Sequence, residues 1–232
     1  MSFIVAEIGI NWEGDLKIAE EMMKKAKEAG CDAVKFQAFN KELVEGHPEA
    51  ERLIKSSITE TNIKKINELS ENVGIEWFCT PMFPEAVKML EPYVNRYKIR
   101  VKDGKPLFEK SISELLKQVL NTGKEVIISC EEDPHTTQVY ENKNIKWLYC
   151  IPKYPCKLED INFEKIKNFD GYSNHCPDII APITSIILGG EIVEIHVTLD
   201  KLENHIDNPV SFDFNELEKL VQLIRNSEEI KK

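Results

Sequence analysis

The sequence predicts a single-domain (β/α)8 barrel, the TIM-barrel fold of the α/β class, over residues 1–232. Two observations support this expectation. Eight short β-like runs alternate with helix-like segments, and their spacing is more even than in an open doubly wound sheet. A chain of 232 residues also suits one large core better than two small ones.

Hydrophobic periodicity gives the elements in chain order. In the first helix Ile18, Met22 and Ala26 recur at helical spacing, and Gly30 closes the helix. The polar stretch 38–57 is expected to be a functional loop over the barrel mouth. The expected strands are residues 3–10, 32–37, 75–79, 96–100, 125–129, 145–150, 171–173 and 191–197. The expected helices are residues 16–29, 59–73, 84–90, 106–120, 158–167, 177–188 and 214–225, with a weak position at 133–142 that is poor in apolar periodicity.

Polar side chains stand where a barrel interior should be apolar. Strands covered by helices outside and packed with side chains inside should be apolar on both faces. Alternation instead turns polar residues inward; Lys35, for example, opposes Val34 and Phe36. Because unpaired buried charges are costly, such residues are expected to serve one another, a metal or a ligand. The inward set is Glu7, Lys35, Lys98, Ser129, Ser173, His175, Glu194 and His196.

This set has two chemical interpretations beyond packing. Lys35, Lys98 and Arg100 would form a local anion site. His175 and His196, with adjacent carboxylates, would form a divalent metal site with open positions for water or substrate. For any single residue of this set, a buried side chain with its hydrogen bonds satisfied is an equally good interpretation. Eight polar residues on one face instead favour a functional site.

Composition limits the partners. The net charge of -10 argues against nucleic acid and anionic membranes, which both require clustered Lys and Arg. The N-terminus lacks a basic region and its apolar run is broken at Glu7, so we expect no signal peptide and a cytoplasmic location. The 6 cysteines form no CxxC motif and are expected to be reduced.

Seven short blocks lie in order along nearly the whole chain. They are residues 6–11 (AEIGIN), 33–37 (AVKFQ), 80–81 (TP), 97–99 (YKI), 154–155 (YP), 173–175 (SNH) and 196–200 (HVTLD). Together they resemble the sialic acid synthase (N-acetylneuraminate synthase) family, which includes the spore coat polysaccharide synthases. The resemblance implies a TIM barrel that condenses phosphoenolpyruvate with an N-acetylated aldose, of the N-acetylmannosamine kind, to give a nonulosonic acid and phosphate.

The resemblance also implies roles for individual residues. His175 and His196 would bind a divalent metal, most often Mn²⁺ with Mg²⁺, Co²⁺ or Zn²⁺ as alternatives, which would polarise the sugar aldehyde. A homodimer is a further expectation. The catalytic candidates are Glu7, Lys35, Lys98 and Tyr154. The substrate-binding candidates are Gln37, Thr80, Ser129, Ser173 and Asp207, together with Arg100 and Lys102, which the family pattern does not contain.

Several positions depart from the family pattern. Trp12 replaces a histidine, residues 100–103 (RVKD) replace a glycine-rich phosphate cradle, and residues 130–132 (CEE) replace Thr-Gly-Met. The sequence also ends where the family commonly continues into an antifreeze-like domain, so we expect that domain to be lacking. Our hypothesis is that Arg100 and Lys102 form a side-chain phosphate clamp in place of the lost backbone donors.

Alternatives remain open at this point. The barrel could bind a metal and an anionic sugar or phosphate ligand without turnover, or act as a different metal-dependent aldolase or lyase. Cys176, beside His175, could assist a softer metal, although packing is the favoured interpretation for the cysteines near the mouth. His47, His135 and His205 lie in polar loops and receive no role.

Overall fold

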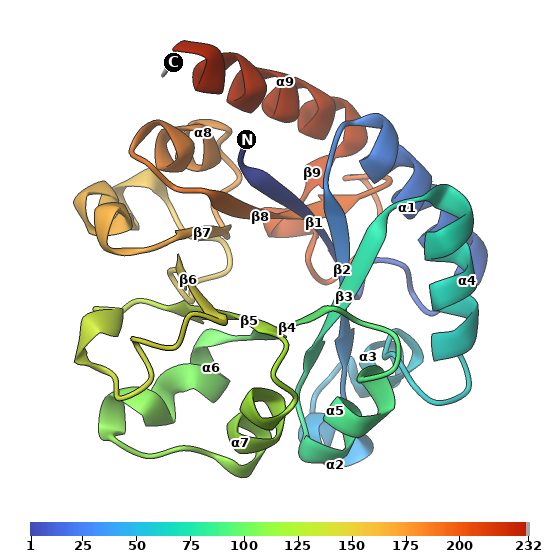
Figure 1. The fold of residues 1–232 in the computed structure, drawn as a ribbon. Coiled ribbons are helices and arrows are strands. Elements are labelled where there is room, and N and C mark those ends of the chain that lie inside the picture. Colours follow the sequence, from blue (N-terminus) through green and yellow to red (C-terminus); the bar gives the residue numbers. More distant parts are fainter. Residues whose placement is uncertain (231–232) are drawn as a thin grey trace.

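Eight parallel strands pair in chain order and close into a barrel in the computed structural model, which describes residues 1–230 (Figure 1). β1 pairs with both β2 and β8, so the first and last barrel strands are neighbours. The predicted fold is confirmed. The strands are β1 (Phe3–Gly9), β2 (Ala33–Ala38), β3 (Glu76–Pro81), β4 (Arg96–Ile99), β5 (Glu125–Cys130), β6 (Ile145–Tyr149), β7 (Gly171–Asn174) and β8 (Ile192–Thr198), and the short β9 (Phe212–Asp213) pairs with the end of β8.

Helices surround the barrel, as Figure 1 shows. α1 (Leu16–Glu28) begins after Asp15, whose carboxylate accepts a hydrogen bond from the backbone amide of Lys17, and it buries Met22 and Met23. This apolar stripe faces the strands, as an amphipathic helix requires. The other α-helices are α2 (Lys41–Val44), α3 (Ala50–Lys55), α4 (Ile63–Val73), α5 (Pro84–Leu90), α6 (Val101–Gly104), α7 (Glu114–Asn121), α8 (Ile180–Ile187) and α9 (Phe214–Ile230).

The prediction of one helix over residues 106–120 is wrong. The segment contains the 3-10 helix η1 (Lys105–Glu109) and then α7, separated by Lys110 in the left-handed conformation with φ 57°. A new helix starts because the Ser113 hydroxyl accepts a hydrogen bond from the amide of Leu116. Local capping therefore divides a stretch whose apolar spacing suggests continuity.

Three other connections differ from the expected pattern. Residues 133–142 contain the 3-10 turn η2 (Pro134–Thr136) and no α-helix, which accords with their weak periodicity. The helix predicted at 158–167 is instead η3 (Leu158–Asp160) followed by η4 (Phe163–Asn168), because Asn162 caps a second start. The predicted loop 38–57 carries α2 and α3. The peripheral layer is thus less regular than the barrel.

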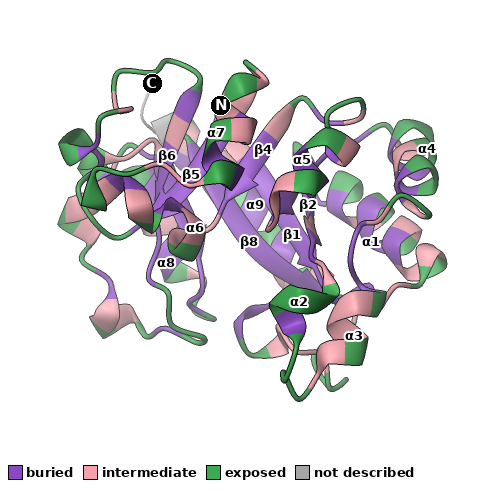
Figure 2. Ribbon diagram, turned by 90° about the horizontal axis from the view of Figure 1, so that it is seen from below, coloured by how far each residue is buried: buried purple, intermediate pink, exposed green. Residues whose placement is uncertain are grey.

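The strands are almost entirely buried, as Figure 2 shows. In the core, the ring of Phe36 meets Trp12 and Trp77 edge-on, with centroids 5.8 and 6.2 Å apart. The Trp12 indole N–H also donates to the carbonyl of Ser56 at 2.9 Å. This hydrogen bond fastens the connection after β1 to the connection after β2, and both connections border the barrel mouth.

All six cysteines are buried and unpaired in the structure, as expected from the absence of a CxxC motif. Within residues 1–230, none of the helices has the combination of length and apolar character that crossing a bilayer demands.

Candidate active site

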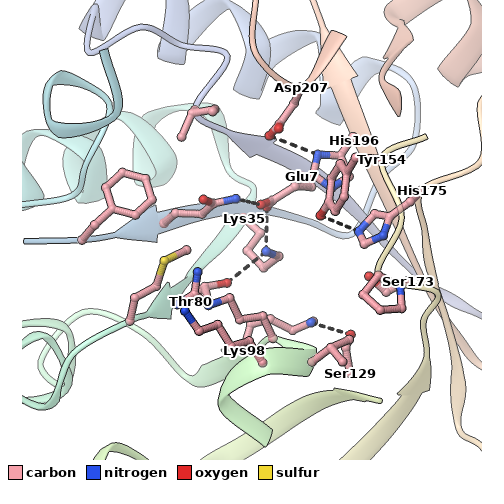
Figure 3. A pocket seen from close by; sticks show the side chains of 18 of the residues that line it. Glu7, Lys35, Thr80, Lys98, Ser129, Tyr154, Ser173, His175, His196 and Asp207 are labelled. Carbon is pink, nitrogen blue, oxygen red and sulfur yellow. Dashed lines mark hydrogen bonds and ion pairs between the residues drawn. The ribbon is translucent and has the colours of Figure 1, made fainter. Parts of the chain in front are cut away.

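A cavity of about 440 Å³ opens at the carboxyl ends of the strands (Figure 3). This is the end of a (β/α)8 barrel at which active sites are found. Every residue predicted for the site lines this cavity, although its individual role stays a prediction. These residues are Glu7, Lys35, Gln37, Thr80, Lys98, Arg100, Lys102, Ser129, Tyr154, Ser173, His175, His196 and Asp207.

A network of buried charges forms the floor of the cavity. The ammonium nitrogen of Lys35 lies 2.9 Å from Glu7 Oε2 and 3.7 Å from Glu194 Oε2. Lys98 lies 3.9 Å from Glu194 Oε1 and donates to the Ser129 hydroxyl at 2.6 Å. These side chains are at most 4% exposed. These side chains point inward, as strand alternation predicts, so two lysines and two glutamates meet. The positive charges compensate the negative charges.

Strand register explains why these partners meet. Glu7 of β1 lies beside Lys35 of β2 on one side and beside His196 of β8 on the other. Ser173 of β7 lies beside Glu194 of β8, and its hydroxyl donates to Glu194 Oε1 at 2.9 Å. These two contacts therefore join neighbouring strands, whereas the ion pairs of Glu194 with Lys35 and Lys98 join β8 to β2 and β4, which are not its neighbours in the sheet.

The two carboxylates on the floor have opposite pKa shifts. Burial raises the pKa of Glu7 above its ordinary value, and Lys35 offsets this only in part. Burial also acts against charge on Glu194, but Lys35 and Lys98 together lower the pKa of that carboxyl to about 2. Glu194 is thus a fixed anion, whereas Glu7 is the group suited to proton transfer.

The lysines differ as well. Burial acts to lower the pKa of Lys35, yet Glu194 and Glu7 raise it above the ordinary value. Burial lowers the pKa of Lys98, and the neighbouring charge of Lys35 adds to that effect. An incoming anion would contribute a second negative partner to Lys98, which would favour its charged form.

The contribution of Glu194 to the free energy of unfolding should depend on pH. Because its folded pKa of about 2 lies below the ordinary value of 4.5, its stabilising contribution is complete above pH 4.5 and is lost as the pH falls toward 2. We expect wild type to exceed Glu194→Gln in free energy of unfolding at pH 7, and this difference to shrink at pH 3. Urea unfolding at both pH values measures it. A difference that stays constant between pH 7 and pH 3 would contradict this role.

The two imidazoles lie at the mouth, above the charged floor. Their ring centroids are 5.4 Å apart. The Nδ1–H of His175 donates to the carbonyl of Ile151 at 2.8 Å, which leaves Nε2 with its lone pair facing the Tyr154 hydroxyl at 2.7 Å. Burial lowers the pKa of His175 and favours the neutral ring. His196 Nδ1 lies 3.4 Å from Asp207 Oδ2.

These donors fit a divalent ion held by two imidazoles. A backbone carbonyl that fixes the ring tautomer, as Ile151 does for His175, is the arrangement that metal-binding histidines use. Within residues 1–230 no group of three or more His, Cys, Asp or Glu side chains is placed to hold an ion. Substrate and water would therefore have to complete the coordination, as in a site with open positions.

Gly9 makes room for the polar groups to converge. It adopts φ 56°, a left-handed conformation that other residues rarely take. A Cβ atom at this position would lie 3.1 Å from Asp207 Oδ2, 3.2 Å from Glu7 Oε1 and 3.3 Å from Gln37 Nε2. Gln37 Nε2 in turn donates to Glu7 Oε1 at 2.7 Å. The glycine therefore allows Glu7 of β1, Gln37 of β2 and Asp207 of the connection after β8 to meet.

The two residues predicted to form a phosphate clamp, Arg100 and Lys102, lie at the rim of the cavity. The Arg100 guanidinium is already ion-paired with Asp103 one turn along the chain, and about a third of its side chain is exposed. Lys102 is exposed and forms no ion pair with any residue between 1 and 230. Of the two clamp candidates, Lys102 is the one whose charge is available to a ligand.

The outer wall of the cavity is apolar, a feature that sequence periodicity does not reveal. Its side chains come from the connections after β1, β2, β3 and β8 and pack as one small cluster. The cluster residues that also line the cavity are Ile10, Phe39, Val44, Leu53, Met82 and Ile206. A ligand bound here would place a charged end on the floor and an apolar group against this wall.

The cysteines separate into two environments. Cys150 lines the cavity, with its sulfur 3.7 Å from His175 Nδ1, and burial raises its pKa to about 11. Cys176 instead packs with Cys156 and Tyr172 in a separate apolar cluster. The packing interpretation of Cys176 therefore accords with the structure, and a thiol ligand to a metal at His175 would not come from this residue.

Comparisons with known proteins show which sequences and structures this chain resembles. The sequence model of the NeuB family matches residues 22–232. An uncharacterised protein of Methanocaldococcus jannaschii is 34% identical over 97% of this chain and 70% of its own length. The N,N'-diacetyllegionaminic acid synthase of Legionella pneumophila is 28% identical over 98% and 72%. The structure of N-acetylneuraminic acid synthetase from Leptospira borgpetersenii superimposes with a TM-score of 0.88 at 29% identity, over 99% of this chain and 85% of that one.

Proposed function

This chain belongs to the NeuB family, whose synthases condense phosphoenolpyruvate with sugars, and we propose that it joins phosphoenolpyruvate to an N-acetylated aldose. One water molecule would add at C2 of the enol phosphate and expel the phosphate, so the products would be a nonulosonic, sialic-acid-like sugar acid and inorganic phosphate. The proposal keeps a divalent metal, with Mn²⁺ as the expected ion, and the cytoplasm as the expected location.

The observation that carries the proposal is the division of the cavity into a charged floor with two buried lysines and an imidazole-lined mouth. Phosphoenolpyruvate brings a phosphate and a carboxylate, and Lys35 and Lys98 are two buried ammonium groups that can neutralise them. The hydroxyls of Thr80, Ser129 and Ser173 lie on the same floor as further donors. The apolar outer wall supports an acceptor with a methyl-bearing group, such as an N-acetyl substituent.

Each group has a task in the condensation that we propose. Carbon–carbon bond formation turns the aldehyde oxygen of the sugar into a hydroxyl, which requires a proton. Glu7, with its raised pKa, would hold and deliver that proton. A divalent ion at His175 and His196 would supply Lewis-acid polarisation of the aldehyde. Tyr154 and Asp207 would orient the sugar beside these histidines.

Phosphate release tests this proposal directly. Purified protein incubated with Mn²⁺, phosphoenolpyruvate and N-acetylated hexosamines should release phosphate only when all three are present, and the Lys98→Met variant should release far less. The absence of release with every aldose at high protein concentration would contradict the proposal. Binding of metal and anion without release would instead favour a barrel that holds these ligands without turnover.

A further inference from the structure

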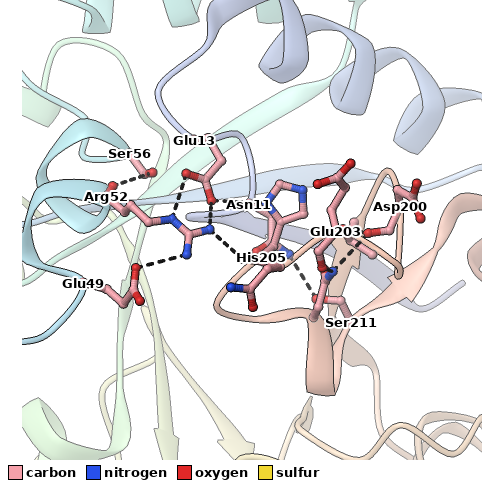
Figure 4. Close-up of polar contacts among 12 residues, drawn as sticks. Asn11, Glu13, Glu49, Arg52, Ser56, Asp200, Glu203, His205 and Ser211 are labelled. Atoms are coloured by element: carbon pink, nitrogen blue, oxygen red, sulfur yellow. Dashed lines mark hydrogen bonds and ion pairs between the residues drawn. The ribbon is translucent and has the colours of Figure 1, made fainter.

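Glu13 is the centre of an ion-pair cluster at the edge of the barrel mouth (Figure 4). Its carboxylate accepts two hydrogen bonds from Arg52, at 2.6 Å from Nη2 to Oε1 and at 3.2 Å from Nε to Oε2. The Nδ1–H of His205 donates to Glu13 Oε1 at 3.1 Å. Paired, bidentate hydrogen bonds of this kind fix the orientation of both partners.

The cluster joins three connections that are distant in sequence. Glu13 follows β1, Arg52 lies in α3 after β2, and His205 lies between β8 and β9. Arg52 also donates to Glu49 at 3.0 Å and to the backbone carbonyl of Asn204 at 2.7 Å. The side chains of Arg52, Glu13 and His205 are 31%, 21% and 16% exposed, so water screens this cluster less than it screens an ordinary surface pair.

The backbone around Glu13 is held in an unusual conformation. Glu13 has φ 53°, which residues other than glycine seldom adopt. The next residue, Gly14, approaches α3 so closely that a Cβ atom would lie 2.2 Å from the carbonyl of Lys55. Conformations of this kind persist where the surrounding contacts determine them, and they occur at sites of function.

Residues adjacent to the cluster line the cavity. Leu53 follows Arg52, and Ile206 and Asp207 follow His205; all three are cavity residues. Asp207 reaches the position near Glu7 and Gln37 that Gly9 leaves free, and it lies 3.4 Å from His196 Nδ1. The cluster itself lies outside the cavity lining, so it can influence a ligand only through these neighbours.

We propose that Glu13, Arg52 and His205 form a latch that holds the 199–211 connection over the cavity and thereby positions Ile206 and Asp207 to receive the acceptor sugar. The latch residues are positioning residues. For the identity of the ligand, this inference rests on the function proposed above.

Kinetics of the Glu13→Gln and Arg52→Met variants test the latch. We expect the KM for the acceptor aldose to rise about tenfold in each, while the KM for phosphoenolpyruvate stays within about twofold of wild type, since the lysine floor is untouched. The Lys201→Met variant is the matched control. Lys201 lies in the same connection and pairs with Glu216 of α9 at 2.8 Å, but it contacts neither Glu13 nor Asp207, so both KM values should stay unchanged.

Hydrogen exchange of the unliganded protein provides a readout that needs no turnover. Backbone amides of residues 199–211 should exchange faster in Glu13→Gln and Arg52→Met than in wild type and Lys201→Met. A wild type without phosphate release would refute the proposed function, whereas exchange would still report on the latch. Equal exchange in all four proteins, or equal increases in both KM values, would overturn the latch.

Discussion

Lys35→Met is expected to reduce phosphate release by about 10²–10³-fold and to lower the free energy of unfolding by about 3–5 kcal/mol. Lys35 is the cation between Glu7 and Glu194, and all three side chains are at most 4% exposed. Its removal leaves two buried carboxylates with fewer countercharges, and it removes a partner for the anionic substrate. Steady-state kinetics and urea unfolding at pH 7 measure the two effects.

A double variant separates these two effects of Lys35. The double variant Lys35→Met/Glu7→Gln also removes one of the two carboxylates that lose their countercharge. It should therefore recover part of the lost stability without recovering activity. Lys146→Met is the matched control, because Lys146 is a strand lysine whose ion pair with Asp170 is about one-third exposed. It should change stability by less than about 1 kcal/mol. Because Glu7→Gln itself removes the proposed proton donor, activity is compared in the single variant: phosphate release per folded molecule that is equal in Lys35→Met and wild type would show that Lys35 acts only on folding.

His196→Phe should weaken Mn²⁺ binding by at least about 100-fold and abolish phosphate release. The substitution keeps a ring of similar size but removes both nitrogens, while His175 retains its hydrogen bond to Ile151. Titration calorimetry of the purified protein with Mn²⁺, in the absence of substrate, measures this affinity independently of turnover.

His135→Asn is the control for the metal prediction. His135 is exposed and pairs with Asp133 at 2.7 Å, away from the cavity, so its replacement should leave Mn²⁺ affinity unchanged. Wild type that binds no Mn²⁺, or His196→Phe that binds it as well as wild type, would contradict a two-imidazole site. Equal losses in His196→Phe and His135→Asn would indicate nonspecific binding.

The barrel and the inward direction of its charges could be predicted from the sequence because both depend on local alternation. Residues two apart in a strand share a face, so Glu194 and His196 had to point together once β8 was recognised. The same argument placed Lys35 and Lys98 inside. The shared cavity at the strand ends follows from the closure of the barrel.

Details set by individual hydrogen bonds could not be predicted. The break between η1 and α7 depends on Lys110 in a left-handed conformation and on the Ser113 cap, neither of which changes the apolar spacing. The role of Glu194 as the partner of both lysines depends on contacts of β8 with β2 and β4, which are not its neighbours in the sheet. The cluster around Glu13 joins three connections whose approach is fixed only by the complete fold, so Arg52 and His205 gave no signal in the sequence.

The pairing of β1 with β8 has a consequence for synthesis on the ribosome. Glu7 and Lys35 emerge early, whereas Glu194 and His196 emerge only after most of the chain has been translated. In a nascent chain the inward-facing Glu7 and Lys35 therefore lack their partners on β8. These side chains are expected to stay hydrated until the last barrel strand pairs with the first. Binding of phosphate-bearing ligands should accordingly arise in a single late step, and truncated translation products ending before residue 192 should have none of it.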